Sequence, residues 1–223
     1  MNLYRHFISV FYPERCPFCN DLIEAKDVAC EKCLRQLSEN RRPIIRGAGG
    51  FRCVSSFPYE GNVRRMLIRI KFYERIQHIR QSAVFLADDV RTCYEGIDFD
   101  CITAVPMHPK DQKARGFNQC ELLAQELSKL LGTPFQPTLE KIKRTRKQHH
   151  LKFRERRKNL AGAFRIIDKD SIKGKRILIV DDIVTTGNTL GACCKMLARA
   201  KPELICCATI ANASLPESKK PMI

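Results

Sequence analysis

The chain has 223 residues, a hydrophobic content of 44% and a formal net charge of +16 at pH 7. This length allows one sizeable core plus a small accessory unit. The charge favours a polyanionic partner or an anionic surface, although a solvated basic face alone accounts for part of such an excess. No run approaches the roughly 18 apolar residues that a membrane helix needs, so we expect no membrane span.

The cysteine content points to a reducing compartment. The N-terminal residues 1–15 have too short an apolar run for a secretory signal and lack a small-residue cleavage site. Twelve cysteines without such a signal predict thiols that bind metal or are buried, in a cytoplasmic protein. Eight of them lie in apolar runs or on predicted apolar helix faces and are interpreted as small core residues: positions 53, 93, 101, 120, 193, 194, 206 and 207.

The other four cysteines form two C-x-x-C pairs separated by ten residues: Cys16, Cys19, Cys30 and Cys33. Each pair lets two thiolates reach one tetrahedral ion, so the two pairs predict a closed, structural Zn²⁺ site. The alternative, two redox dithiols, lacks the βαβ pattern that such motifs need. We therefore expect an N-terminal zinc module at residues 1–45, joined by a polar, glycine-rich linker at 39–50 to a second domain at 46–223.

The sequence of the first half of the second domain predicts one strand and two helices. Residues 51–59 are expected to form a strand, and apolar residues at helical spacing over 63–70 predict a helix with Lys71 just after its apolar face. A second helix is expected over 76–94, where the acidic pair Asp88–Asp89 is expected to be a solvated surface.

A short buried strand is expected at 100–105, followed by a loop over 106–117 and a helix over 118–131 that ends at Gly132. The loop carries Lys110, Lys113 and Arg115. Basic residues at the carboxyl edge of a parallel strand are placed for a phosphate group, and a solvated loop remains the alternative.

Residues 141–158 form the most biased segment, with ten Lys or Arg residues and one acid. Such a run normally marks a solvated face or a nucleic-acid-binding tail. Here it lies between a proline-flanked stretch and the strand expected at 163–167, so we predict an excursion over the carboxyl edge of the sheet. His149 and His150 lack the second pair that a metal site would need.

The stretch RILIVDDIVTTGNTL, residues 176–190, predicts the central site. Its apolar run 177–180 is expected to be a buried parallel strand that ends at Asp181 and Asp182. The turn that follows opens a helix over 189–199, whose free N–H groups can hold a phosphate. Two carboxylates beside a phosphate cradle suit a phosphorylated ribose.

Strands and helices alternate through residues 100–211, where the last strand is expected at 204–211. This alternation predicts an α/β fold with a mostly parallel sheet and helices on both faces. Ligands of such sheets lie outside the carboxyl ends of the strands, where both candidate loops fall.

Several motifs carry a family resemblance. VDDIVTTGNT resembles the phosphoribosyl-pyrophosphate signature of type I phosphoribosyltransferases. Five segments in order resemble the ComF or ComFC competence proteins, which include the GntX-type proteins: CPFC…CEKC, YEGNVRRMLIRIKF, VPMHPKDQKARGFNQCELLA, RTRKQHHLKFRERRKNLAGAF and the signature itself. The resemblance implies a type I phosphoribosyltransferase-like domain after an N-terminal zinc finger.

The resemblance also implies residue roles. Asp181 and Asp182 would bind the ribose hydroxyls of phosphoribosyl pyrophosphate, directly or through Mg²⁺. The 5′-phosphate would lie on Thr185, Thr186, Gly187, Asn188 and Thr189, and the pyrophosphate on the loop with Pro106, Met107, Arg115 and Gly116. Asn188 departs from the alanine or serine common in the motif, but it is still small and polar. A receiver-like acidic pocket, the alternative for the aspartate pair, lacks the T-T-G-x-T turn.

The family implies a role in natural transformation: handling incoming single-stranded DNA at the cytoplasmic side, with a helicase and a recombination mediator as partners. Charge neutralisation plus stacking gives sequence-tolerant binding. The candidate DNA-binding residues are Lys143, Arg144, Arg146, Lys147, Lys152, Phe153, Arg154, Arg156, Arg157 and Lys158. Two alternatives stay open: an active phosphoribosyltransferase, in the glycosyltransferase class, and a nucleic-acid-binding regulator that senses phosphoribosyl pyrophosphate.

Overall fold

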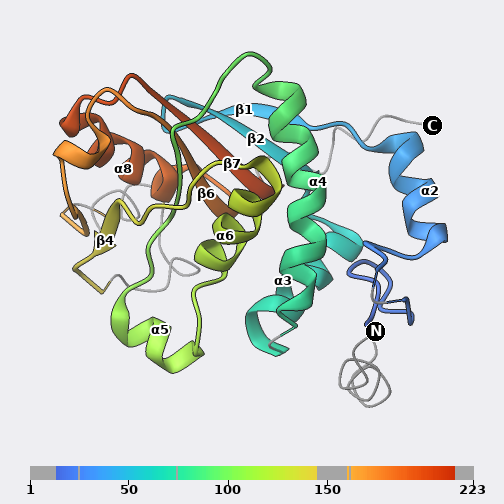
Figure 1. Ribbon diagram of the computed structural model, residues 1–223. Coiled ribbons are helices and arrows are strands. Elements are labelled where there is room, and N and C mark those ends of the chain that lie inside the picture. The colour runs from blue at the N-terminus through green and yellow to red at the C-terminus, as the bar shows by residue number, and fades with distance from the viewer. Residues whose placement is uncertain (1–13, 25, 74, 145–159, 161, 214–223) are drawn as a thin grey trace, which may run out of the picture.

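A five-stranded sheet forms the centre of the computed structural model (Figure 1). The structure describes residues 14–24, 26–73, 75–144, 160 and 162–213. The antiparallel edge strand β1 pairs with β2, and the other strands run parallel. In spatial order the strands are β1 (Ile44–Ala48), β2 (Phe51–Pro58), β7 (Leu204–Asn212), β6 (Arg176–Val184) and β3 (Cys101–Ala104).

Helices cover both faces of this sheet, which confirms the predicted architecture (Figure 1). The face in front in Figure 1 carries α3 (Gly61–Tyr73), α4 (Gln77–Cys93) and α6 (Gln119–Leu131), and the opposite face carries α8 (Asn188–Leu197). Because β6 and β7 are buried on both sides, they read as continuous apolar runs. Each face therefore has its own hydrophobic cluster.

Shorter elements complete the described chain. A separate antiparallel pair, β4 (Leu139–Lys141) and β5 (Phe164–Ile166), flanks the basic segment. Single 3-10 turns occur at η2 (Asp170–Ile172) and η3 (Ala198–Ala200). No helix in the described part of the chain is long and apolar enough to cross a membrane.

The loop expected at 106–117 contains a short helix, α5 (Pro109–Arg115). Its start follows from local chemistry, because the His108 side chain accepts from the Lys110 N–H and proline stands at the first helical position. Gly116 ends it with φ of +87°, a left-handed conformation that glycine adopts without strain.

The segment 39–50 was expected to be a linker, and this expectation is wrong. It contributes the end of α2 (Glu31–Asn40) and the strand β1, which pairs with β2 along five residues. The first cysteine knuckle is also tied to the main core, because the Phe18 ring packs edge-on against Phe57 and Phe85 at 5.5 and 5.7 Å. The division of the chain at residue 45 stays a prediction.

The acidic pair on α4 was expected to face solvent, and for Asp89 this is wrong. Asp89 is 3% exposed and forms an ion pair with Arg41, whose guanidinium lies 5.3 Å from the ring centres of both Phe57 and Phe85. Burial raises the pKa of Asp89, and Arg41 opposes that shift. This pair fastens the end of α2 to α4.

Replacing Arg41 with methionine should therefore destabilise the fold by roughly 3 kcal/mol, because it leaves a buried carboxylate without its partner. Chemical denaturation measures the loss. The matched control is Arg91→Met, whose ion pair with the neighbouring acid, Asp88, is more than half exposed and is worth at most about 1 kcal/mol. Equal denaturation midpoints for the two variants would contradict the structural role of the Arg41–Asp89 pair.

Candidate ribose-phosphate site and four-cysteine cluster

Asp181 and Asp182 lie within β6, which corrects the expectation that the strand ends at them. The strand continues to Val184 because β7 keeps pairing with it. Pairing with β3 stops earlier, at Ala104 opposite Val180. The two carboxylates therefore lie on the part of β6 that extends beyond β3, at the sheet's carboxyl edge, and each aspartate is only 8% exposed.

Asp182 is held by two side chains that sequence reasoning did not assign to the site. Lys71 Nζ lies 3.2 Å from Asp182 Oδ2, and Gln119 Nε2 donates to the same oxygen at 3.2 Å. Burial acts to raise the pKa of Asp182, but the Lys71 charge and the hydrogen bonds outweigh it and lower the pKa. Asp182 is thus an ionised carboxylate at neutral pH.

Gln119 also connects this carboxylate to the predicted pyrophosphate loop. Its side-chain oxygen accepts a hydrogen bond from Arg115 Nη1 at 2.7 Å, while its amide nitrogen donates to Asp182. Gln119 is 6% exposed, so its orientation is set by these two partners. A movement of Arg115 toward a ligand would consequently change the hydrogen bond that Gln119 donates to Asp182.

Asp181 has a different environment from its neighbour. The Cys120 thiol donates to Asp181 Oδ1 at 3.1 Å, and the backbone N–H of Asp182 donates to the same oxygen at 2.9 Å. Burial and the charge of Asp182 raise the pKa of Asp181 to about 7. Burial likewise keeps Cys120 protonated by raising its pKa. The pair therefore offers one firm anion and one carboxyl group poised near neutrality.

The two aspartates suit a hard cation. Oxygen donors are what Mg²⁺ prefers, and the carboxylates of Asp181 and Asp182 lie within 4.8 Å of one another and of the Cys120 sulfur. The ammonium of Lys71 already contacts one of these oxygens. An ion bound at Asp182 Oδ2 would compete with Lys71 for it.

The turn after β6 brings most of the predicted phosphate residues together. Asp181, Thr185, Gly187, Asn188 and Thr189 line one small pocket. Gly187 precedes α8 with φ of +70°, and the backbone N–H groups in the first turn of a helix suit an anion. Thr186 is exposed on the same turn and lines a second cavity of about 600 Å³ toward β1.

A close backbone approach fixes the start of α8. A Cβ atom added at Gly191 would lie 2.7 Å from the Cα atom of Gly49, in the turn between β1 and β2. One added at Gly187 would lie 3.0 Å from the Cα atom of Ala48. The hairpin turn and the phosphate turn therefore pack together only because glycine stands at these positions.

The predicted pyrophosphate residues do not all converge. Arg115 is joined to Asp182 through Gln119, and Gly116 follows it at the end of α5. Pro106 and Met107 instead line a separate cavity of about 190 Å³ against β4.

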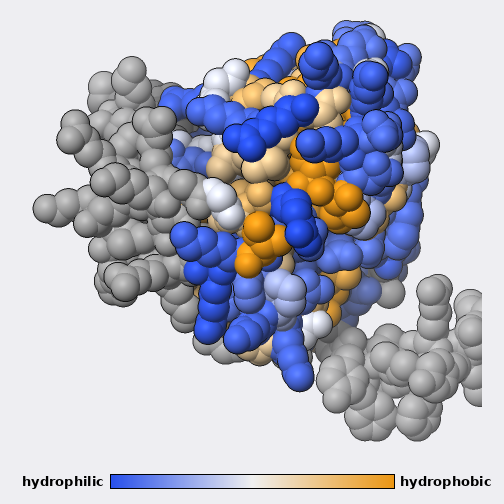
Figure 2. Space-filling view, turned by 90° about the vertical axis from the view of Figure 1, so that its left-hand side faces the viewer, coloured by the Kyte–Doolittle hydropathy of each residue, from blue (hydrophilic) through white to orange (hydrophobic). Residues whose placement is uncertain are grey.

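Two of the predicted DNA-binding residues are described. Lys143 is exposed, and Arg144 Nε lies 2.9 Å from Asp111 Oδ1 in an exposed ion pair. Figure 2 shows the face that lies on the left in Figure 1, where hydrophilic residues surround a smaller hydrophobic area. The other eight predicted DNA-binding residues lie outside the described residues: Arg146, Lys147, Lys152, Phe153, Arg154, Arg156, Arg157 and Lys158.

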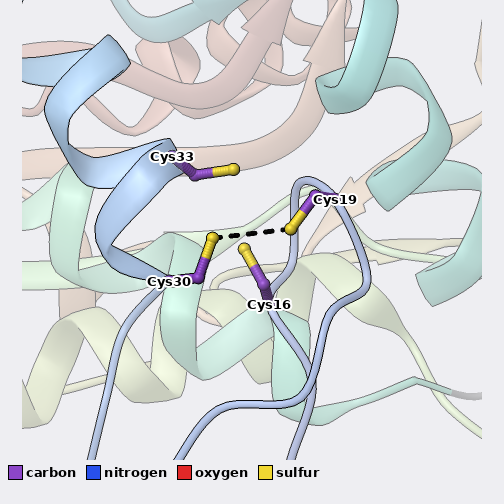
Figure 3. Close-up of side chains that lie close together, drawn as sticks. All are labelled: Cys16, Cys19, Cys30 and Cys33. Carbon is purple, nitrogen blue, oxygen red and sulfur yellow. Dashed lines mark hydrogen bonds between the residues drawn. The ribbon is translucent and has the colours of Figure 1, made fainter.

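The four N-terminal cysteines converge as predicted (Figure 3). Cys16 and Cys19 come from a loop, and Cys30 and Cys33 from the start of α2, with all four sulfur atoms within 4.8 Å of one another. The Cys19 and Cys30 sulfurs are 3.5 Å apart. Burial would raise the pKa of Cys16, but backbone hydrogen bonds lower it overall, which favours the thiolate. This cluster could hold a metal ion, and four sulfurs suit Zn²⁺.

Sequence reasoning missed Lys71, Gln119 and Cys120 as site residues. Gln119 and Cys120 had a usable signal, since the helix predicted from Asn118 has its first turn at the carboxyl edge of the sheet. Lys71 lies in the family-like segment YEGNVRRMLIRIKF, but its partner is 111 positions away, and their contact depends on how α3 crosses the sheet.

The chain is similar to one known domain and to several solved structures. The phosphoribosyl transferase domain model matches residues 118–221, so this part of the chain has the phosphoribosyltransferase type of fold, as predicted. Adenine phosphoribosyltransferase is among the similar solved structures, with a TM-score of 0.44 and 15% identity over 81% of this chain and 89% of that chain.

Two curated relatives cover most of the chain. The DNA utilization protein YhgH of Salmonella typhimurium is 30% identical over 188 residues, which span 82% of this chain and 78% of that protein. Competence protein F of Haemophilus influenzae is 29% identical over 195 residues, which span 85% and 81%. The chain therefore belongs to the family of DNA utilization protein YhgH and competence protein F.

Proposed function

We propose that this protein handles internalised single-stranded DNA in natural transformation and holds phosphoribosyl pyrophosphate, or a related ribose phosphate, at the end of β6. The observation that carries the ligand is the buried pair Asp181–Asp182, followed by the turn that opens α8 and linked through Gln119 to Arg115. The names of the relatives, a competence protein and a DNA utilization protein, support the DNA part.

Each part of the ligand has a chemically suited partner. Asp181 and Asp182 would accept hydrogen bonds from the ribose hydroxyls, directly or through Mg²⁺, which would also screen the pyrophosphate charge. The N–H groups and hydroxyls of residues 185–189 would hold the 5′-phosphate. Arg115, beside Gly116, would face the pyrophosphate with a delocalised charge.

The DNA contact would involve the basic segment 141–158. Cations there would neutralise phosphates, and Phe153 would stack on a base. The N-terminal module, residues 1–45, would hold structural Zn²⁺ at its four cysteines. A cytoplasmic location, a competence helicase and a recombination mediator fit this role.

The DNA part predicts a salt-dependent affinity. Binding to labelled oligothymidylate, followed by fluorescence anisotropy, should weaken with salt by about 0.7 per neutralised phosphate on a log–log plot. Changing Arg154, Arg156, Arg157 and Lys158 to glutamate should lower both affinity and slope. The control changes four exposed cations elsewhere to glutamate: Lys169, Lys173, Lys195 and Arg199. Salt-independent binding, absent binding or equal losses in both variants would refute the proposal.

An active phosphoribosyltransferase is the second candidate, favoured by the intact acidic pair and its link to Arg115. Such an enzyme positions the sugar while a base nitrogen displaces pyrophosphate at ribose C1. It should then release pyrophosphate with at least one nucleobase of a panel. A silent panel with retained ligand binding would favour a ligand-sensing regulator, whose DNA affinity should change when the pocket is filled.

A further inference from the structure

The exposed side of α3 carries an unusual combination of groups. Phe72 is 69% exposed, more than any other large hydrophobic side chain recorded for the described residues. The helix contains four cations (Arg64, Arg65, Arg69 and Lys71) and no acidic residue. A single exposed phenylalanine is ordinary on a surface. On a helix whose charged residues are all cations, however, the ring is suited to stack on a base of a nucleic acid whose phosphates the cations contact.

Two of the four cations already have partners within the protein. Lys71 lies against Asp182, and Arg69 donates to the backbone oxygens of Pro17 and Phe18 in the first cysteine knuckle. Arg64 and Arg65 are exposed and have no carboxylate partner within the described ranges, although Arg65 donates to Asn62 Oδ1. These two guanidinium groups are therefore available to a polyanion.

The spacing along α3 places the free groups on one side. Arg65 and Phe72 are seven residues apart, which is about two helical turns, or about 10 Å along the axis. The opposite side is fixed, because Met66, Leu67 and Ile70 are buried in the hydrophobic cluster beneath. Charge on one turn and an aromatic ring two turns later is the pairing that single-stranded nucleic acid needs.

We propose that this side of α3, comprising Arg64, Arg65 and Phe72, is a binding surface for single-stranded DNA, with the Phe72 ring stacked on a base and the arginines on phosphates. This rests on the proposed function and adds a contact separate from the basic segment 141–158. Because Lys71 of the same helix contacts Asp182 and Arg69 contacts the cysteine knuckle, α3 joins the DNA surface to both the acidic pocket and the candidate metal centre.

The test compares stacking with charge in the full-length protein. Phe72→Ala should weaken binding to labelled oligothymidylate about 5- to 150-fold and leave the salt slope unchanged, whereas Phe72→Trp should retain the affinity. Arg64→Glu with Arg65→Glu should reduce the salt slope by about 1.4, since two phosphate contacts are lost. The ring control is Ile45→Ala, which removes a 48% exposed side chain on β1. The charge control is Lys195→Glu with Arg199→Glu on the far face.

Unchanged affinity of Phe72→Ala, with the wild type binding DNA, would overturn this inference and leave the proposed function intact. A wild type that does not bind DNA would overturn both. Dimerisation of the wild type that Phe72→Ala abolishes would assign the ring to an interface between copies and also overturn the inference. Thermal melting of each variant checks folding, which should be preserved because all three side chains point away from the core.

Discussion

Cys33→Ser should abolish zinc binding at the four-cysteine cluster and unfold the N-terminal module. A four-thiolate site contributes free energy on the order of 10–16 kcal/mol at neutral pH, which a segment with almost no core of its own cannot replace. The loss should spread beyond the module, because the Phe18 ring would leave its place against Phe57 and Phe85. We expect the rest of the chain to lose about 3–5 kcal/mol, the usual cost of removing a buried phenylalanine.

Metal content by atomic absorption and thermal melting together measure this effect. Cys93→Ser is the matched control, since that half-buried thiol lies outside the cluster at the end of α4. It should keep one zinc per chain and nearly the wild-type melting temperature. A Cys33→Ser protein that retains zinc and melts like the wild type would refute a structural zinc site.

Asp181→Asn combined with Asp182→Asn should weaken phosphoribosyl pyrophosphate binding at least about 100-fold. Each carboxylate would accept a hydrogen bond from a ribose hydroxyl, and a hydrogen bond to a charged group is worth about 1.5–3 kcal/mol. Asparagine keeps the shape but removes the charge. Gln119→Leu should have a smaller effect, because it only unties Arg115 from Asp182.

The control for this pair is Asp88→Asn with Asp98→Asn, two exposed aspartates away from the pocket. It removes the same formal charge and should leave the affinity unchanged. Equilibrium dialysis with labelled ligand compares the variants, and circular dichroism checks that they are folded. Equal dissociation constants for wild type and the Asp181/Asp182 variant would rule out the carboxylates as ribose ligands.

The parts of the fold that local sequence determines were predictable. Apolar runs identified β7 and the first part of β6, and the helix expected over 118–131 before Gly132 corresponds to α6. The convergence of the four cysteines followed from the knuckle geometry. In each case the determining residues are neighbours in sequence.

The errors arose where a partner lies far along the chain. From the sequence, Asp89 was predicted to be a surface acid on α4. Its partner Arg41 lies 48 positions earlier, and the Arg41 guanidinium packs on the rings of Phe57 and Phe85. From the sequence, Lys71 was only a polar residue at the end of a helix; its contact with Asp182 appears only in the folded chain. The segment 39–50 was interpreted as a linker because it is polar, basic and glycine-rich, yet Gly49 is required for close packing against Gly191.

Calorimetric titration of phosphoribosyl pyrophosphate, with and without Mg²⁺ and with and without single-stranded DNA, tests whether the end of β6 binds a ribose phosphate. We expect saturable binding at one site per chain that the Asp181→Asn/Asp182→Asn variant loses. A ligand-dependent shift in DNA affinity would show that the two sites are coupled. Absence of any saturable heat with the folded wild type, under every one of these conditions, would contradict a ribose-phosphate pocket at the end of β6.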